Sequence, residues 1–387
     1  MKRSRNERRL DGQYQPDQTG RFQHSLRTTT CMGDPFQHLD TIVIGGGQSG
    51  LAVGYYLNQH DREFVVFDAS DRIGDAWRHR WDSLQLFTQA QYSSLPGLPF
   101  PAPDNHFPTK DEVADYLETY ASTFDLPVCL GTTVETLSQQ DGRYVVEIET
   151  ERGSQPITVE NVVVATGAFA TPNVPAFNDT LDPAITQFHS TAYRNPEQIS
   201  EGAALVVGAG NAGAEIATDL AATGQQTFLS GPETGSIPLR LFNSRLFWWL
   251  GRNVITAGSW LCKRIEQRSR ARGDPLVRLT EPEIRQAGVK RVPRTQGVKN
   301  GRPVLDGEPL EVATVVWATG FQPDYSWIDL PGLRFDAGGY PINDRGVVPE
   351  QPGLYFIGLP YQSTVVSASL GGVGADARHV VDHLCTN

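Results

Sequence analysis

The stretch DTIVIGGGQSGLAVG, residues 40–54, decides how this chain folds. Thr41–Ile44 is a short β-branched apolar run of the kind found in buried parallel strands. Gly45, Gly47 and Gly50 follow it in the spacing GxGxxG, and small and apolar residues at helical spacing come next. This order of strand, glycine turn and helix predicts a dinucleotide-binding unit, in which the helix N-terminus faces a pyrophosphate.

A second strand and an acidic residue complete this unit. The run Glu63–Phe67 is largely apolar, and Asp68 lies 18 residues past Gly50. An acidic side chain at this distance typically binds a ribose hydroxyl. GxGxxG alone also occurs in ordinary glycine-rich turns, but a strand, a helix and an acid in register favour the dinucleotide interpretation.

The length and net charge of the chain limit the kinds of function that it can have. A chain of 387 residues is long for one hydrophobic core, so two domains, or one domain with an insertion, are expected. The formal net charge of −11 argues against a nucleic-acid partner. No apolar run approaches the roughly 20 residues of a membrane span, and none near the N-terminus resembles a secretory signal. We therefore expect no transmembrane segment and a cytoplasmic location.

The N-terminal segment, residues 1–37, lacks any apolar periodicity and is predicted to be a disordered leader. Its basic start is interpreted as a solvated charge run in preference to a targeting or nucleic-acid tail. Because Met32 precedes the first strand closely, we expect that the functional protein begins there.

The cysteines are too far apart to form a CxxC motif, so neither a redox dithiol nor a metal site is expected. They are Cys31, Cys129, Cys262 and Cys385.

A second fingerprint begins 163 residues after the first. Ala204–Val207 predicts a strand, and Gly208, Gly210 and Gly213 repeat the GxGxxG spacing before a second helix. The next strand ends in Ser230-Gly231-Pro232, without a carboxylate. Since an acid there would repel a 2′-phosphate, its absence favours NADPH over NADH.

Other elements are expected around the two fingerprints. They are a helix at Thr109–Phe124, strands at Val128–Leu137 and Arg143–Glu149 around an Asp141-Gly142 hairpin turn, a strand pair within Ile157–Val164, strands at Val312–Trp317 and Leu354–Ile357, and a helix at Gly371–Leu384. The segment 240–273 mixes aromatic, aliphatic and basic residues. We interpret it as a helical excursion that covers a substrate channel; a peripheral membrane contact or a homodimer contact is the alternative.

This order of elements resembles that of the class B flavin-dependent monooxygenases from about Leu39 to the C-terminus. The segment Phe188–Arg194 resembles the second half of the family fingerprint FxGxxxHxxxW/F, with His189 and Tyr193 in place. Pro183 and Ile185 stand where the first half has Phe and Gly, which weakens assignment to the Baeyer–Villiger branch or to the amine- and sulfide-oxidising branch.

The resemblance implies an α/β fold with two Rossmann-like dinucleotide-binding domains, an FAD domain carrying an inserted NADPH domain. The expected parts are 38–170 and 312–387 for FAD and 171–311 for NADPH. The segments Ala165-Thr166-Gly167 and Ala318–Phe321 look like the two linkers between them. The cofactor-binding residues implied are Gly45, Gly47, Gln48, Ser49, Gly50, Asp68, Trp77, Thr88, Val134, Ala165, Thr166, Gly167, Ser190, Tyr193, Arg194, Gly208, Gly210, Asn211, Ala212, Gly213, Ser230, Thr319, Gly320, Gly358 and Leu370.

The implied activity inserts one oxygen atom of dioxygen into a small organic substrate through a C4a-peroxyflavin. His189 and Thr88 are the candidate catalytic side chains, and His189 is expected to act through its position and not as a general base. Two alternatives stay open: an NAD(P)H-dependent flavoprotein reductase, and a flavoprotein redox sensor or transport accessory with weak turnover.

Overall fold

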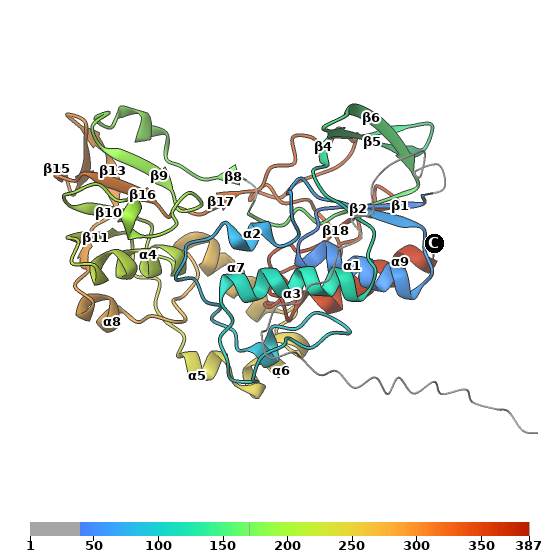
Figure 1. Ribbon diagram of the computed structural model, residues 1–387, viewed down its shortest axis with the longest axis horizontal. Coiled ribbons are helices and arrows are strands. Elements are labelled where there is room, and N and C mark those ends of the chain that lie inside the picture. The colour runs from blue at the N-terminus through green and yellow to red at the C-terminus, as the bar shows by residue number, and fades with distance from the viewer. Residues whose placement is uncertain (1–38, 170, 387) are drawn as a thin grey trace, which may run out of the picture.

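Two parallel sheets organise the chain in the computed structural model, which describes residues 39–169 and 171–386 (Figure 1). The predicted leader lies outside these residues. The first sheet has the strand order β18-β7-β1-β2-β3. Its strands are β1 (Thr41–Ile44), β2 (Phe64–Phe67), β3 (Val128–Cys129), β7 (Asn161–Val164) and β18 (Leu354–Phe356).

Helices cover one face of the first sheet and a small antiparallel sheet covers the other, as Figure 1 shows. The helices are α1 (Gln48–Gln59), α3 (Lys110–Thr123) and α9 (Val373–Thr386), with the short α2 (Asp75–Arg78) and the 3-10 turn Ala90–Tyr92 beside them. The antiparallel sheet consists of β4 (Thr133–Gln140), β5 (Arg143–Thr150) and β6 (Gly153–Val159). Apolar side chains fill both interfaces, so the first sheet is buried on both faces, as its continuous apolar strands predict.

The strand predicted over Val128–Leu137 is split in the structure. Gly131 adopts a left-handed backbone (φ 58°) and separates β3, which joins the first sheet, from β4, which joins the antiparallel sheet. The expected hairpin is confirmed, because Asp141 and Gly142 both have positive φ (51° and 80°), as a tight two-residue turn requires.

The second sheet has the order β12-β11-β10-β16-β9 and packs against α4 and α8. Its elements are β9 (Thr186–His189), β10 (Ala204–Val207), α4 (Asn211–Ala222), β11 (Thr227–Ser230), α8 (Glu281–Gln286), β12 (Lys290–Val292) and β16 (Thr314–Trp317). The small sheet β13 (Thr295–Lys299), β14 (Arg302–Leu305) and β15 (Glu308–Pro309) lies beside it, with 3-10 turns at Ala176–Thr180 and Pro196–Gln198.

The sheet order places the end of the second domain later in the chain than we expected. We expected the chain to leave the second domain at 311/312, but β16 pairs in parallel with β10 and with β9. The chain therefore leaves the second sheet only after Trp317. Sequence alone did not show this, because a buried apolar strand is compatible with either sheet.

Two chain segments connect the sheets in the middle of the molecule (Figure 1). β8 (Thr171–Pro172) and β17 (Phe321–Gln322) run side by side there as an antiparallel pair. The helical excursion is confirmed as α5 (Leu239–Phe242), α6 (Arg245–Asn253) and α7 (Trp260–Arg272). In residues 39–169 and 171–386, none of the helices combines the length and the apolarity that crossing a bilayer requires.

Candidate functional site

The first glycine loop connects β1 to α1 and leaves space for a ligand at one position only. A Cβ atom at Gly47 would meet no atom within 4 Å, whereas one at Gly50 would overlap the carbonyl oxygen of Gly45. Gly50 therefore lets the helix pack on the loop, and Gly47 is the residue that faces open space. Because no side chain caps α1, its first N–H groups remain available to an anion.

Asp68 closes one side of this loop. Its carboxylate accepts hydrogen bonds from the backbone N–H of Gly46 (2.5 Å) and of Ser70 (2.8 Å). Thr132 donates its backbone N–H to the Asp68 carbonyl (2.9 Å), which brings the start of β4 and hence Val134 to the same edge. The predicted ribose-binding acid therefore lies directly at the glycine loop.

The C-terminal part of the chain reaches the same loop. The Gln48 side chain donates to the Ala368 carbonyl (3.0 Å), and Ser49 packs against Gly358 so closely that a side chain there would overlap it. Leu370 is buried in the core beside them. Residues 309 and 320 positions apart in sequence thus converge around the first fingerprint.

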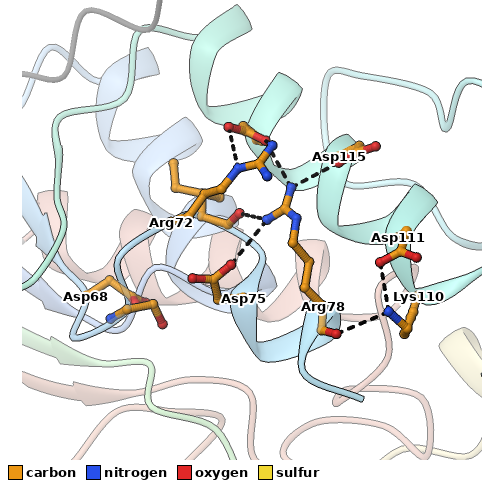
Figure 2. A network of polar contacts seen from close by, with 10 residues as sticks. Asp68, Arg72, Asp75, Arg78, Lys110, Asp111 and Asp115 are labelled. Carbon is orange, nitrogen blue, oxygen red and sulfur yellow. Dashed lines mark hydrogen bonds and ion pairs between the residues drawn. The ribbon is translucent and has the colours of Figure 1, made fainter. Parts of the chain in front are cut away.

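A network of ion pairs holds α2 and its Trp77 against α3 (Figure 2). Arg78 pairs with Asp115 (2.9 Å), Glu118 (3.0 Å) and Asp75 (3.5 Å) and donates to the Ile73 carbonyl. Arg72 extends the network by pairing with Glu118. Lys110 extends it by donating to the Arg78 carbonyl and to the Asp111 carboxylate. The side chain of Arg78 is only 16% exposed, so its contacts bear on stability more than those of Arg72, which is 53% exposed.

The second glycine loop repeats the geometry of the first. A Cβ at Gly210 would meet nothing within 4 Å, and one at Gly213 would overlap the carbonyl oxygen of Gly208. α4 also begins without a side-chain cap. The side chain of Asn211 holds a neighbouring loop: its amide donates to the Pro275 carbonyl (3.1 Å) and accepts from Val277 N–H (3.0 Å). Ala212 packs against the core beside it.

The end of β11 differs from the sequence-based expectation. Ser230 is fully buried, and its hydroxyl donates to the Pro293 carbonyl (2.9 Å) while accepting from Thr295 N–H (2.9 Å). Its hydroxyl is therefore not free for a ligand. The same contacts place the exposed Arg294 at this strand end, and Arg291 donates to the Gly231 carbonyl (3.0 Å).

The second linker, Ala318–Phe321, contacts His189. Its Nε2 lies 3.0 Å from the Gly320 carbonyl oxygen and its ring is 5.2 Å from that of Phe321. Thr319 donates its hydroxyl to the Asn173 carbonyl, and Asn173 N–H donates to Gly320 (2.9 Å). The Ala165 N–H donates to the Ile44 carbonyl (2.8 Å), which anchors the first linker, Ala165-Thr166-Gly167, at the first glycine loop.

Two arginines lie at this junction and were not singled out together by the sequence. The guanidinium carbon of Arg80 is 5.7 Å from the Phe321 ring centroid, and burial, then the nearby charge of Arg194, lower the pKa of Arg80. Arg194 donates to the carbonyls of Thr191 (2.6 Å) and Tyr193 (3.0 Å). Two neighbouring cations at the junction favour an anionic ligand. The sequence alone does not show that Arg80 and Arg194 lie close together, because 113 residues lie between them.

Several predicted site residues are buried and hydrogen-bonded within the protein. Tyr193 is fully buried and donates its hydroxyl to Asp219 (2.7 Å). Thr88 is buried, and its hydroxyl shares a hydrogen bond with Ser93 (2.8 Å). Both side chains support the fold around the site. Ser190 donates its backbone N–H to Trp317 and is likewise buried.

The excursion lies beside the Thr88 segment. Asn243 bridges the two, accepting from Gln89 N–H (2.8 Å) and donating to the Phe87 carbonyl (2.9 Å). An open pocket of about 290 Å³ lies here, lined by Gln89, Phe107, Leu239, Arg240 and Asn243.

Comparison with known proteins agrees with this geometry. Residues 42–236 match the family model described as pyridine nucleotide-disulphide oxidoreductase. An uncharacterized CzcO-like oxidoreductase of Geobacillus kaustophilus is 42% identical over 354 residues, covering 90% of this chain and 99% of that protein. A probable indole-3-pyruvate monooxygenase of Arabidopsis thaliana is 28% identical, covering 89% of this chain and 88% of that one.

A solved structure shows the same arrangement of elements. The flavin-containing monooxygenase from Stenotrophomonas maltophilia is 28% identical to this chain and matches it with a TM-score of 0.71, over 90% of this chain and 98% of that one.

Proposed function

This chain belongs to the class B flavin monooxygenase-like branch of the pyridine nucleotide-disulphide oxidoreductases, and on that premise we propose that it is an NADPH- and FAD-dependent monooxygenase acting on a small organic substrate. It is a flavin-dependent oxidoreductase by family. The observation that carries the finer proposal is the pair of glycine loops, Gly45–Gly50 and Gly208–Gly213. Each is open at its middle glycine, but only the first has an acid at the following strand end.

FAD fits the first loop. Gly47 and the uncapped start of α1 would hold the pyrophosphate, and Asp68 would bind the adenosine ribose. Trp77, clamped through α2, and the segment Gly358–Leu370 would enclose the rest of the cofactor. We propose that this domain comprises residues 38–170 together with the chain after Trp317.

NADPH fits the second loop. Gly210 and the start of α4 would hold its pyrophosphate. The strand end lacks a carboxylate, and the exposed Arg294 supplies a cation there, so a 2′-phosphate would be attracted and not repelled. We therefore assign the contact with the 2′-phosphate to Arg294.

The residues between the sheets would position the reactants. The reduced flavin, when bound, supplies the oxygen-transfer chemistry, for which a C4a-peroxyflavin is the proposed oxidant. Phe321 and His189 would shield the junction from water, and Arg80 with Arg194 would orient an anionic group of the coenzyme or substrate. Burial lowers the pKa of His189, and its Nδ1 accepts from the Thr191 N–H while Nε2 faces the Gly320 carbonyl, so we assign it the role of holding Gly320.

Flavin content and acceptor choice test this proposal. The purified protein should contain one FAD per chain, and NADPH should reduce it without air. Aerobic turnover should then couple NADPH oxidation to an oxygenated product, faster than to a quinone or disulfide acceptor. Gly47→Val should give colourless protein; a variant that keeps stoichiometric FAD contradicts the assignment of the first loop. A preference for quinone or disulfide would identify a reductase instead.

A further inference from the structure

The excursion formed by α5, α6 and α7 exposes an unusual concentration of apolar side chains. Of the ten large apolar side chains that are exposed in the described part of the chain, six lie between residues 241 and 261. They are Leu241, Leu246, Trp249, Val254, Trp260 and Leu261. Single exposed apolar residues are ordinary, but a group of this kind marks an interaction surface.

α6 shows that this exposure does not come from poor packing. Its inner face is well buried: Trp248 stacks on Tyr92 with ring centroids 5.0 Å apart, and Gly251 packs against Val366. On the opposite face, Leu246 is 63% exposed and Trp249 is 57% exposed. One helix therefore carries two apolar faces, of which the core covers one.

The segment that carries these apolar side chains is rich in basic residues. Residues 239–273 contain eight basic side chains and one acidic one, a net charge of +7 in a chain whose total is −11. The basic residues are Arg240, Arg245, Arg252, Lys263, Arg264, Arg268, Arg270 and Arg272. The acidic residue, Glu266, is paired with Arg270 (2.8 Å). The segment is thus strongly cationic within an acidic protein.

From this combination of exposed apolar and basic side chains on α5, α6 and α7, which we call the α5–α7 face, we infer that this face binds peripherally to the surface of an anionic phospholipid bilayer. Tryptophan and leucine enter the interface between headgroups and acyl chains, while arginine and lysine attract anionic headgroups. α5 and α6 lie at the lower edge of the molecule in Figure 1, away from both sheets, so a flat surface can reach them. A second copy fits less well, because a symmetric contact would bring two faces of charge +7 together.

Such docking would place the pocket at Gln89, Arg240 and Asn243 next to the bilayer. If the proposed monooxygenase function holds, an apolar substrate could enter that pocket from the membrane. The binding itself does not depend on the function, so the two can fail separately.

Vesicle sedimentation of the full-length flavoprotein tests the inference. Vesicles of equimolar phosphatidylcholine and phosphatidylglycerol should bind the protein and shift its tryptophan emission to the blue. Pure phosphatidylcholine vesicles should bind it far less, and salt should release it from the anionic vesicles. The double variant W249S/W260S should bind anionic vesicles at least about tenfold more weakly, since Trp260 is 73% exposed and both indoles are lost from the interface.

Matched controls identify the face. Ile342→Ser changes an exposed apolar residue elsewhere and should leave binding unchanged. K263Q/R264Q should weaken binding to anionic vesicles only. Because every variant keeps residues 1–38, any contribution of that segment is constant. Absence of binding to anionic vesicles, or binding that W249S/W260S does not weaken, overturns the inference. A dimer that the double variant dissociates, without vesicle binding, would assign the face to a second copy.

Discussion

The Nε2 atom of His189 lies 3.0 Å from the carbonyl oxygen of Gly320, 131 residues further along the chain. This contact joins the end of β9 to the second linker, and Thr191 occupies the other ring nitrogen (Oγ1 to Nδ1, 3.1 Å). Burial, followed by the charge of Arg80, lowers the pKa of His189, although the Gly320 carbonyl opposes this. The neutral ring donates from Nε2, which makes His189 a positioning residue.

Stability should therefore depend on pH through His189. Its ordinary pKa is 6.5 and its folded pKa is lower, so the unfolded chain binds the proton first as the pH falls. The free energy of unfolding should decrease below about pH 6.5, by at most about 1.4 kcal/mol per pH unit from this group. Urea unfolding of the wild type and of His189→Gln across this range checks it. The variant should show a shallower slope; parallel curves would contradict the assignment.

The two glycines of the second loop should respond differently to the same substitution. Gly213→Ala pushes a methyl group into the carbonyl of Gly208 and should lower the free energy of unfolding by about 1–3 kcal/mol. Gly210→Ala meets open space and should cost less than about 1 kcal/mol. It should retain FAD but raise the NADPH dissociation constant about tenfold or more, because the methyl group occupies the ligand space. Unchanged NADPH affinity in Gly210→Ala would place the coenzyme elsewhere.

The clamp on α2 should matter for retention of the flavin. Arg78→Gln removes contacts with Asp115 and Glu118 and should lower the free energy of unfolding by about 1.5–3 kcal/mol. Faster release of FAD should accompany this loss, since α2 carries Trp77. Arg72→Gln, on the exposed side of the same network, should cost no more than about 1 kcal/mol. Thermal unfolding and flavin fluorescence measure both; equal effects would show that burial does not decide the difference.

Coenzyme choice should depend on Arg294. Loss of a charged hydrogen bond to the 2′-phosphate is worth about 1.5–3 kcal/mol, or roughly ten- to a hundredfold in affinity. Arg294→Gln should weaken NADPH by this factor and leave NADH unaffected. Arg302→Gln, an exposed arginine paired with Glu311, serves as the control. Anaerobic flavin reduction with both coenzymes decides the matter, and an equal loss for NADH and NADPH would exclude the phosphate contact.

Arg294→Gln tests coenzyme choice more cleanly than Gly231→Asp would. Gly231→Asp would add the missing acid, but Gly231 has φ 139°, and a Cβ there would lie 3.1 Å from the Ala209 nitrogen. A loss of NADPH binding in that variant would therefore mix backbone strain with charge repulsion.

Local patterns in the sequence predicted the framework of the fold correctly. The glycine spacing and the apolar strands gave both nucleotide-binding units, because each rests on contacts between residues close in sequence. The position of β16 could not be predicted, since a buried strand does not identify its partner sheet. Which side chains are free to meet a ligand could not be predicted either, because Ser230 and Tyr193 form hydrogen bonds with residues far away in the sequence.

Conversely, the residues that sequence analysis missed owe their positions to long-range packing. Arg294 reaches the β11 end through contacts of its neighbours with Ser230, and Arg80 reaches Arg194 only when the two domains meet. Neither belongs to a spacing motif that could have revealed it.

The central claim, that this chain is a flavin monooxygenase, is tested most directly by the reaction of its reduced form with dioxygen. The protein is reduced with NADPH without air and mixed in a stopped-flow instrument with oxygenated buffer. We predict that the absorption of a C4a-peroxyflavin appears before oxidised flavin returns, and that its decay accelerates with a suitable substrate. Return of oxidised flavin in a single phase, with stoichiometric hydrogen peroxide and no intermediate, would contradict the claim.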